Sequence, residues 1–143
     1  MPVASRHDPS AFAFREEFSV RDYECDMEGI VNNAVYQNYL EHARHQFLRA
    51  AGVDFAALVQ EGIHLVVVRV EIDYVSPLRS GDRFWVGVWG ERLSPLRGVF
   101  HQGIFAHPGD RPALRARVIG ASLNAAHRPA RCAALDLIFP QTA

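Results

Sequence analysis

The sequence predicts an α+β domain in which an antiparallel five-stranded sheet wraps around one long helix. One alternating strand pattern comes first, a single long helical pattern follows it, and four strand patterns then come in succession. This order differs from the strand–helix–strand alternation of parallel sheets, so an antiparallel sheet packed on the helix is the simplest solution. A domain with a single central helix often buries its remaining apolar surface by self-association.

Sequence periodicity is absent at both ends of the chain. Residues 1–11 show no repeating apolar pattern, and from His127 onward the pattern fades. A chain of 143 residues fits one domain with a substantial core. We therefore expect a single domain over residues 1–143, with its core at about residues 14–128.

The first strand and the long helix are predicted from two different periods. Residues 14–23 alternate between apolar and polar side chains, which is typical of a half-buried strand. The helix is expected to begin near Ala34, with Asn33 as its N-cap, and to end at Gly52. Apolar residues recur along it at helical spacing and predict one buried stripe: Tyr36, Leu40, Ala43, Phe47 and Ala50.

The second half of the chain predicts a short helix and four strands. Asp54 is a suitable N-cap for a short helix that ends at Gln60, before Gly62. Alternating patterns separated by turn residues predict strands at residues 63–75, 83–92, 99–107 and 113–124. In the first of these strands, one face is predicted to be apolar: Val66, Val68, Val70, Ile72 and Tyr74.

Composition excludes several classes of function. The formal net charge is −1, which gives no basic field for nucleic acid and no polybasic patch for a membrane surface. The longest apolar run, residues 65–68, is too short to span a bilayer, and the N-terminus has no apolar signal-peptide core. Cys25 and Cys132 have neither metal-type spacing nor a disulfide framework. We expect a soluble, cytoplasmic protein that binds no nucleic acid and no membrane.

The segment from residue 20 to residue 44 carries the candidate site. Asp26 follows the first predicted strand, Gly29 forms a turn after it, and the long helix begins just beyond. A carboxylate beside backbone N–H groups that lack intrahelical acceptors can form an acyl-transfer site, because it brings a nucleophile or base to an oxyanion donor. Taken alone, the same residues also fit an ordinary turn, since Asp and Gly are typical turn residues.

Asn32 and Asn33 are explained by residue type as a turn residue followed by a helix cap. The backbone N–H of Asn33 is the candidate oxyanion donor, and such a donor typically contributes about 10²–10³ in rate. His42 and His45 lie three residues apart on the helix, but no further ligands accompany them, so no metal site is predicted. The chain lacks the Gly-x-Ser-x-Gly, dinucleotide-binding and His-Glu-x-x-His motifs.

Residues 26–36, Asp-Met-Glu-Gly-Ile-Val-Asn-Asn-Ala-Val-Tyr, resemble the signature of the hotdog-fold acyl-CoA thioesterases related to 4-hydroxybenzoyl-CoA thioesterase. The resemblance covers about residues 14–128 and includes the turn at residues 76–82. Many members of the family carry Tyr or His where Asn32 and Asn33 stand here. The form seen here is most similar to the branch that cleaves 1,4-dihydroxy-2-naphthoyl-CoA or medium- and long-chain 3-ketoacyl thioesters.

The resemblance implies a thioesterase that hydrolyses an acyl-CoA or acyl-carrier-protein thioester and needs no cofactor. Asp26 would be the catalytic nucleophile or general base, and the backbone N–H of Asn33 would polarise the thioester carbonyl. Gly29, Asn32 and Tyr36 would contact the substrate, with Tyr36 lining the acyl pocket. The resemblance also implies a homodimer or homotetramer with active sites at the interface between copies.

Two alternative functions stay open for a domain of this family. A non-catalytic acyl-thioester binding module usually carries a DNA-binding element, for which this chain has neither spare length nor a basic patch. A hotdog dehydratase or hydratase typically pairs a histidine with a carboxylate, and residues 26–36 contain no histidine.

Overall fold

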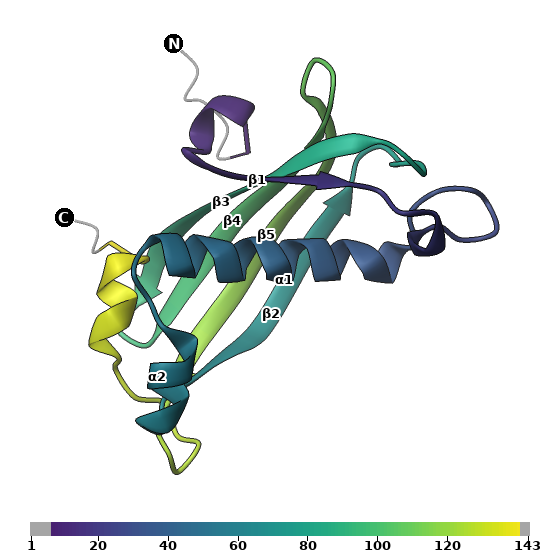
Figure 1. Ribbon diagram of the computed structural model, residues 1–143. Coiled ribbons are helices and arrows are strands. Elements are labelled where there is room, and N and C mark those ends of the chain that lie inside the picture. Colours follow the sequence, from purple (N-terminus) through teal and green to yellow (C-terminus); the bar gives the residue numbers. More distant parts are fainter. Residues whose placement is uncertain (1–6, 141–143) are drawn as a thin grey trace.

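The computed structural model describes residues 7–140 and contains one five-stranded sheet packed on one long helix (Figure 1). The strands are β1 (Phe14–Ser19), β2 (His64–Tyr74), β3 (Arg83–Ser94), β4 (Arg97–Ala106) and β5 (Arg111–Leu123). The α-helices are α1 (Asn33–Ala50) and α2 (Phe55–Gln60), and the short 3₁₀ helices are η1 (Pro9–Ala11), η2 (Asp22–Glu24) and η3 (Ala133–Leu137).

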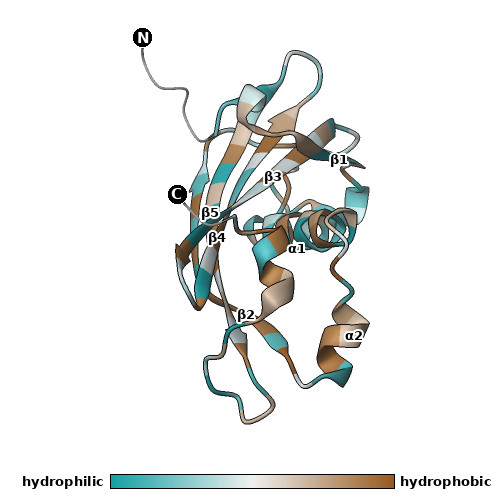
Figure 2. Cartoon of the chain, turned by 90° about the vertical axis from the view of Figure 1, so that its left-hand side faces the viewer, coloured by the Kyte–Doolittle hydropathy of each residue, from teal (hydrophilic) through white to brown (hydrophobic). Residues whose placement is uncertain are grey.

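The sheet has the strand order β1-β3-β4-β5-β2, and every neighbouring pair is antiparallel. Helix α1 lies across one face of the sheet, and Figure 2, which looks almost along α1, shows the strands curving past one side of it. Strands β1 and β2 form the two edges of the sheet. The predicted α+β architecture, a five-stranded antiparallel sheet around one long helix, is confirmed.

Helix α1 begins one residue earlier than the sequence predicts. Asn32 is the N-cap, because its side-chain oxygen accepts a hydrogen bond from the N–H of Ala34 at 2.9 Å. The prediction of Asn33 as the cap was wrong, since both adjacent asparagines suit that position and residue type alone does not separate them. At the other end, α1 stops at Ala50, and Gly52 takes a left-handed conformation with φ of 89°, as expected for a residue that follows a helix.

The buried face of α1 is wider than the single predicted stripe. Tyr36 and Leu40 are buried as expected, whereas Ala50 is exposed. Tyr39 and Leu48, which lie outside the predicted stripe, are buried as well. Because the sheet curves around the helix, it covers more than one line of side chains.

Strand β2 departs from simple alternation. A register shift between Val67 and Arg69 in its pairing with β5 changes which side chains share a face. The prediction of one continuous apolar face was therefore wrong. Apolar side chains stay exposed on this edge strand and just after it: Val67, Val68, Val70, Tyr74 and Val75.

A second, smaller cluster covers the face of the sheet that points away from α1. Phe12 and Trp85 are buried there, and Trp89 packs against them. Phe12 lies over the paired glycines Gly87 and Gly103, and a Cβ atom on Gly87 would come within 2.3 Å of its ring. Residues 7–12 are therefore packed onto the sheet, although no periodicity predicted this; residues 1–6 of the expected loose segment lie outside the described residues.

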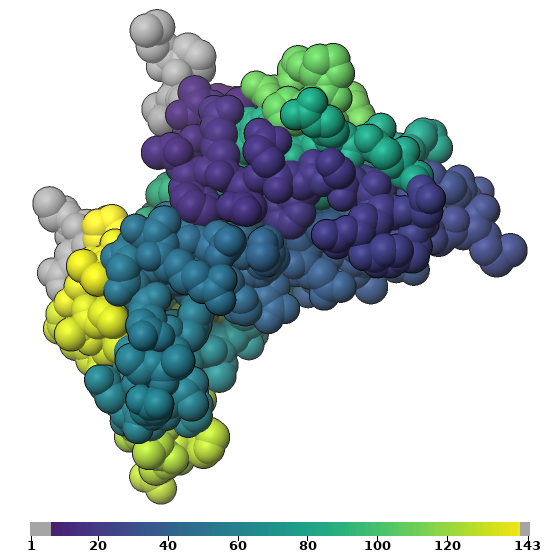
Figure 3. Space-filling model, viewed as in Figure 1, coloured from purple at the N-terminus to yellow at the C-terminus, as the bar shows by residue number. Residues whose placement is uncertain are grey.

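The C-terminal segment packs at the end of α1. Leu135 and Phe139 are buried, and the ring of Phe139 meets that of Phe100 edge-on with a centroid distance of 4.9 Å. A Cβ atom at Gly98 would lie 2.4 Å from Phe139, so this glycine provides the space for the ring. In Figure 3 the yellow C-terminal segment lies directly against the end of α1 and against α2. The fading pattern after His127 therefore does not mark the end of the packed structure.

Within residues 7–140, no helix is both long enough and apolar enough to cross a membrane. Both cysteines are free thiols, and Cys132 is buried. The cytoplasmic location stays a prediction from the sequence.

Candidate active site

A tight turn between η2 and α1 holds Asp26. The N–H of Asp26 donates to the carbonyl of Ile30 at 2.8 Å, and its own carbonyl accepts from the N–H of Gly29 at 3.0 Å. Its carboxylate accepts from the N–H of Glu28 at 2.8 Å. Gly29 has φ of 78°, a left-handed conformation that glycine adopts without strain. These contacts fix the position of the Asp26 side chain, which is exposed in the single chain.

The first predicted strand is shorter than expected, because β1 ends at Ser19 and residues 22–24 form η2. This change places Glu24 in the interior, where it is only 8% exposed. Its carboxylate accepts hydrogen bonds from the hydroxyl of Tyr39 at 2.9 Å and from the N–H of Arg21 at 2.8 Å. Burial, and then the hydrogen bond to Glu24, raise the pKa of Tyr39, so that its hydroxyl stays protonated.

Glu24 also connects this buried network to the start of the helix. Its backbone carbonyl accepts a hydrogen bond from the N–H of Asn32 at 2.9 Å. The N-cap of α1 and the Asp26 turn are thus anchored to the same buried residue. The sequence did not reveal that Glu24 and Tyr39 support the candidate site, since a glutamate in a polar segment gives no sign of burial.

Asn33 is the first residue of α1, so its N–H has no intrahelical acceptor. It lines a hollow of about 360 Å³ together with Asp26 and Tyr36. The opposite wall comes from the end of β2 and the residues after it: Tyr74, Val75, Ser76 and Pro77. The structure therefore brings together three of the five predicted site residues, whereas Gly29 and Asn32 shape the turn and the cap without lining the hollow.

Two tyrosines join the walls of the hollow. The hydroxyl of Tyr74 donates a hydrogen bond to the backbone carbonyl of Asn33 at 3.1 Å. The ring of Tyr74 meets the ring of Tyr36 edge-on, with a distance of 5.5 Å between the ring centroids. Tyr36 is buried, and its hydroxyl accepts a hydrogen bond from the N–H of Leu78 at 3.2 Å. Burial raises the pKa of Tyr36, so it contributes a neutral wall near pH 7. No sequence motif indicated Tyr74, which reaches the site only through the fold.

The hollow combines a carboxylate, a free backbone N–H and apolar walls. The positive end of the α1 dipole adds to the effect of the Asn33 N–H at any oxygen that develops negative charge. Among residues 7–140, no three or more His, Cys, Asp or Glu side chains come together in a way that could hold a metal ion. The arrangement suits attack on an activated carbonyl carbon.

The model of the thioesterase-like superfamily matches residues 20–135, and the chain belongs to this superfamily. The chain is 41% identical over 115 residues to the chloroplastic acyl-acyl carrier protein thioesterase ATL3 of Arabidopsis thaliana, a match that covers 80% of this chain and 60% of that relative. It is 30% identical over 92 residues to the long-chain acyl-CoA thioesterase FadM of Escherichia coli, with coverage of 64% and 69%. The chain thus spans about 60% of the length of its Arabidopsis relative.

Solved structures of similar fold include a 1,4-dihydroxy-2-naphthoyl-CoA thioesterase from Synechocystis, with a TM-score of 0.82 at 19% sequence identity. That match covers 87% of this chain and 94% of the other. A protein from Aquifex aeolicus gives a TM-score of 0.81 at 26% identity, with coverage of 87% and 98%. The fold is the hotdog fold, and both the predicted fold and the predicted family are confirmed.

Proposed function

We propose that this protein hydrolyses an acyl-CoA or acyl-carrier-protein thioester to a free acid and a thiol. The observation that carries the proposal is the hollow at the start of α1, which Asp26 and Asn33 line together. The names of the relatives support both carriers, since one is an acyl-acyl carrier protein thioesterase and another an acyl-CoA thioesterase. A thioester is already activated toward acyl transfer, so the reaction needs no cofactor.

Asp26 can act in either of two ways, and both require its ionised form. As a nucleophile, its carboxylate attacks the thioester carbon, the C–S bond breaks, and water then hydrolyses the mixed anhydride and regenerates Asp26. As a general base, it takes a proton from a water molecule that attacks the same carbon, and that proton passes to the departing thiolate. In both cases the N–H of Asn33 faces the oxygen on which negative charge develops.

The two alternative functions differ from hydrolysis in the residues and the chemistry that they require in this hollow. A dehydratase or hydratase site needs a histidine beside the carboxylate, and no histidine lines the hollow. A binding module would hold the thioester here without cleaving it. Release of a free thiol from the thioester distinguishes hydrolysis from binding alone.

The test is a thiol-release assay on purified protein with a panel of acyl-CoA and acyl-carrier-protein thioesters. Asp26→Asn should lower turnover by about two orders of magnitude or more. The fold should survive, because the asparagine side chain still offers an oxygen to the N–H of Glu28. Glu28→Gln is a matched control, since it removes an exposed carboxylate from the same turn without touching the hollow. Near-normal turnover in Asp26→Asn would overturn the mechanism.

We also propose that the protein self-associates as a homodimer or homotetramer through strand β2. This strand is an edge of the sheet, and it exposes apolar residues such as Val67 and Val68. Tyr74 and Val75 belong to the same exposed strip and also line the hollow. A second copy seated on this edge would therefore complete the wall of the candidate site.

Sedimentation velocity tests this interface. Val68→Asp places a charge in the exposed strip at the β2 register shift and should shift the protein toward the monomer, with a loss of thioesterase activity. Val59→Asp is the control, because Val59 is also an exposed valine but belongs to α2 and not to the exposed strip of β2. An unchanged mass for Val68→Asp would show that association, if present, uses another surface.

A further inference from the structure

The space between α1 and β2 does not end at the Asp26 hollow. A second hollow of about 220 Å³ follows it along the helix, and a third of about 120 Å³ lies at the end of the helix. The second and third share three lining residues, Glu41, Arg44 and Val67. The three hollows follow one another along one side of α1, and we call this series the α1–β2 groove.

The two walls of the α1–β2 groove run in opposite directions along the sequence. On the helix, the lining residues advance from Asn33 in the first hollow, through Leu40 in the second, to Leu48 in the third. On the strand they descend from Tyr74, through Val70, to Leu65. Because the lining residues follow the same spatial order on α1 and on β2, the three hollows lie one after another between these two elements.

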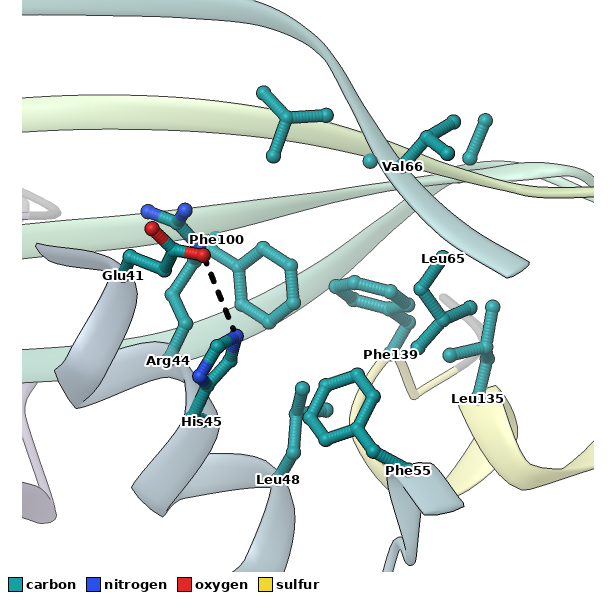
Figure 4. Close-up of a pocket in the computed structure, with 13 residues that line it drawn as sticks. Glu41, Arg44, His45, Leu48, Phe55, Leu65, Val66, Phe100, Leu135 and Phe139 are labelled. Atoms are coloured by element: carbon teal, nitrogen blue, oxygen red, sulfur yellow. Dashed lines mark ion pairs between the residues drawn. The ribbon is translucent and has the colours of Figure 1, made fainter. Parts of the chain in front are cut away.

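The third hollow, which we call the terminal pocket, is mainly apolar (Figure 4). Aromatic and aliphatic side chains from different elements surround it: Leu48, Phe55, Leu65, Phe100, Leu135 and Phe139. Figure 4 shows Phe55, Phe100 and Phe139 gathered around one space, with Leu65 and Leu135 beside them. Such a lining accepts hydrocarbon.

Polar side chains at the mouth of the terminal pocket are bonded to protein atoms. The imidazole of His45 lies 3.7 Å from the carboxylate of Glu41, and the two form an ion pair when His45 is protonated; Figure 4 marks this contact with a dashed line. Arg44 donates to the side-chain oxygen of Gln102 at 3.1 Å, and the buried Gln102 amide in turn donates to the carbonyl of Leu40 at 3.0 Å. Arg44 and Gln102 therefore have protein partners, and Arg44 does not need a polar ligand at this point.

The length of the groove sets the size of its ligand. Arg44 lies eleven residues after Asn33, which corresponds to about 16 Å along the helix axis. An extended chain advances about 1.2 Å per covalent bond, so roughly 14 carbon atoms separate the reaction site from the mouth of the terminal pocket. An apolar cavity of about 150 Å³ can hold benzene, so the 120 Å³ of the terminal pocket holds a few further carbon atoms.

We propose that the α1–β2 groove binds the acyl chain of the substrate and that the terminal pocket receives its methyl end. The substrates are then thioesters of linear chains of about 16 to 18 carbon atoms. This inference rests on the proposed function, because it places the thioester carbon at the Asp26 hollow. A bicyclic aromatic acyl group would fill only the first hollow and leave the terminal pocket empty.

The first test is the chain-length dependence of kcat/KM for saturated acyl-CoAs of about 8 to 22 carbon atoms, a range that brackets the proposed optimum and the shifts expected of its variants. Each additional buried methylene should raise kcat/KM by about fourfold until the terminal pocket is full. A maximum at 8 to 10 carbon atoms, or a preference for aromatic acyl groups, would overturn the inference while leaving thioester hydrolysis intact. If no thioester is hydrolysed at all, the proposed function fails instead.

Two substitutions should move the preferred chain length in opposite directions. Ala121→Leu adds three carbon atoms to the lining of the terminal pocket, and Leu135→Ala removes three from it. We expect the maximum to shift by about two to four carbon atoms, to shorter chains in the first variant and to longer chains in the second. A purely structural defect would lower kcat/KM for all chain lengths by a similar factor and leave the maximum in place, which would count against the inference.

A matched control and a binding measurement complete the test. Leu137→Ala removes the same atoms from the same segment as Leu135→Ala, but Leu137 is 62% exposed and does not line the pocket, so the maximum should not move. Palmitate should bind to the Asp26→Asn protein more tightly than octanoate in a calorimetric titration, and Ala121→Leu should reduce that difference. Equal binding of the two fatty acids would contradict the proposal without any reference to catalysis.

Discussion

The two ends of α1 are built in different ways. At its N-terminus, Asp26, Asn33 and Tyr36 come from one stretch of eleven consecutive residues, and hydrogen bonds hold them in place. At its C-terminus, the terminal pocket takes its lining from α1, α2, β2, β4, β5 and the C-terminal segment. The polar groups of the first end are local in sequence, whereas the second end is assembled from distant parts of the chain and is mainly apolar.

This difference separates two properties of the protein: the reaction that it can carry out and the size of the acyl group that it accepts. Hydrogen-bond geometry decides whether a carbonyl carbon can be attacked, so a short segment with fixed turns is sufficient. Apolar packing decides how much hydrocarbon fits, and the shape of such a space depends on every element around it. Substitutions at the two ends should therefore have effects of different kinds.

The largest expected effect on stability is at the C-terminal end. Phe139→Ala should lower the free energy of unfolding by about 3–5 kcal/mol, because the ring is buried against Phe100 and over Gly98. Urea denaturation measures this change. Leu137→Ala, at an exposed position nearby, should change it by less than about 0.5 kcal/mol. Equal costs for the two variants would mean that the C-terminal segment does not belong to the core.

A smaller effect is expected at the N-terminal end. Tyr39→Phe removes the hydroxyl that donates to the buried carboxylate of Glu24, and should cost about 1–3 kcal/mol of unfolding free energy. Tyr23→Phe removes a hydroxyl from the same region, but Tyr23 is 79% exposed, so its stability should match that of the wild type. If Tyr39→Phe is as stable as Tyr23→Phe, the Glu24 network does not hold the active-site turn.

The smallest effect concerns His45, which lines the mouth of the terminal pocket. Burial lowers the pKa of His45 below 6.5, with Glu41 acting in the opposite direction, and burial lowers the pKa of His7 as well. The unfolded chain therefore binds protons at a higher pH than the folded chain does. Stability from these groups is present above pH 6.5 and is lost as the pH falls below it.

Thermal melts at pH 7.5 and pH 5.5 check this prediction. The drop in Tm on acidification should be smaller in His45→Gln than in the wild type, because the variant keeps only the contribution of His7. The change should be modest, since the His45 side chain is 43% exposed. An identical drop in both proteins would assign the acid sensitivity to other groups.

The sequence predicted which residues meet at the start of α1 better than it predicted the packing at the end of the helix. Asp26 and Asn33 were found because a turn followed by a helix is encoded within a few residues, and the family resemblance covers the same segment. Tyr74 was missed, since only the position of β2 beside α1 brings it to the hollow. Glu24 was missed because a charged residue is buried only when the fold supplies partners such as Tyr39.

Elements were predicted more reliably than the faces they present. All five strands and both α-helices occur where periodicity placed them, with shifts at their ends. The apolar face of β2 was wrong because the register shift near Val68 depends on the pairing with β5, which no local pattern contains. The sequence also did not predict the packing of Phe12 and Phe139, because this packing depends on glycines in strands that are distant in the sequence.

The two tryptophans, Trp85 and Trp89, both belong to the cluster on the outer face of the sheet, where Phe12 contacts Trp85 and the ring of His101 stacks on Trp89. Intrinsic fluorescence therefore reports on the attachment of the N-terminal segment and not on the groove behind the sheet. A titration with a fatty acid followed by tryptophan emission should stay silent even when the ligand binds. An emission change on heating, in contrast, would report the loss of the outer cluster, to which residues 11 and 12 and strand β3 both contribute.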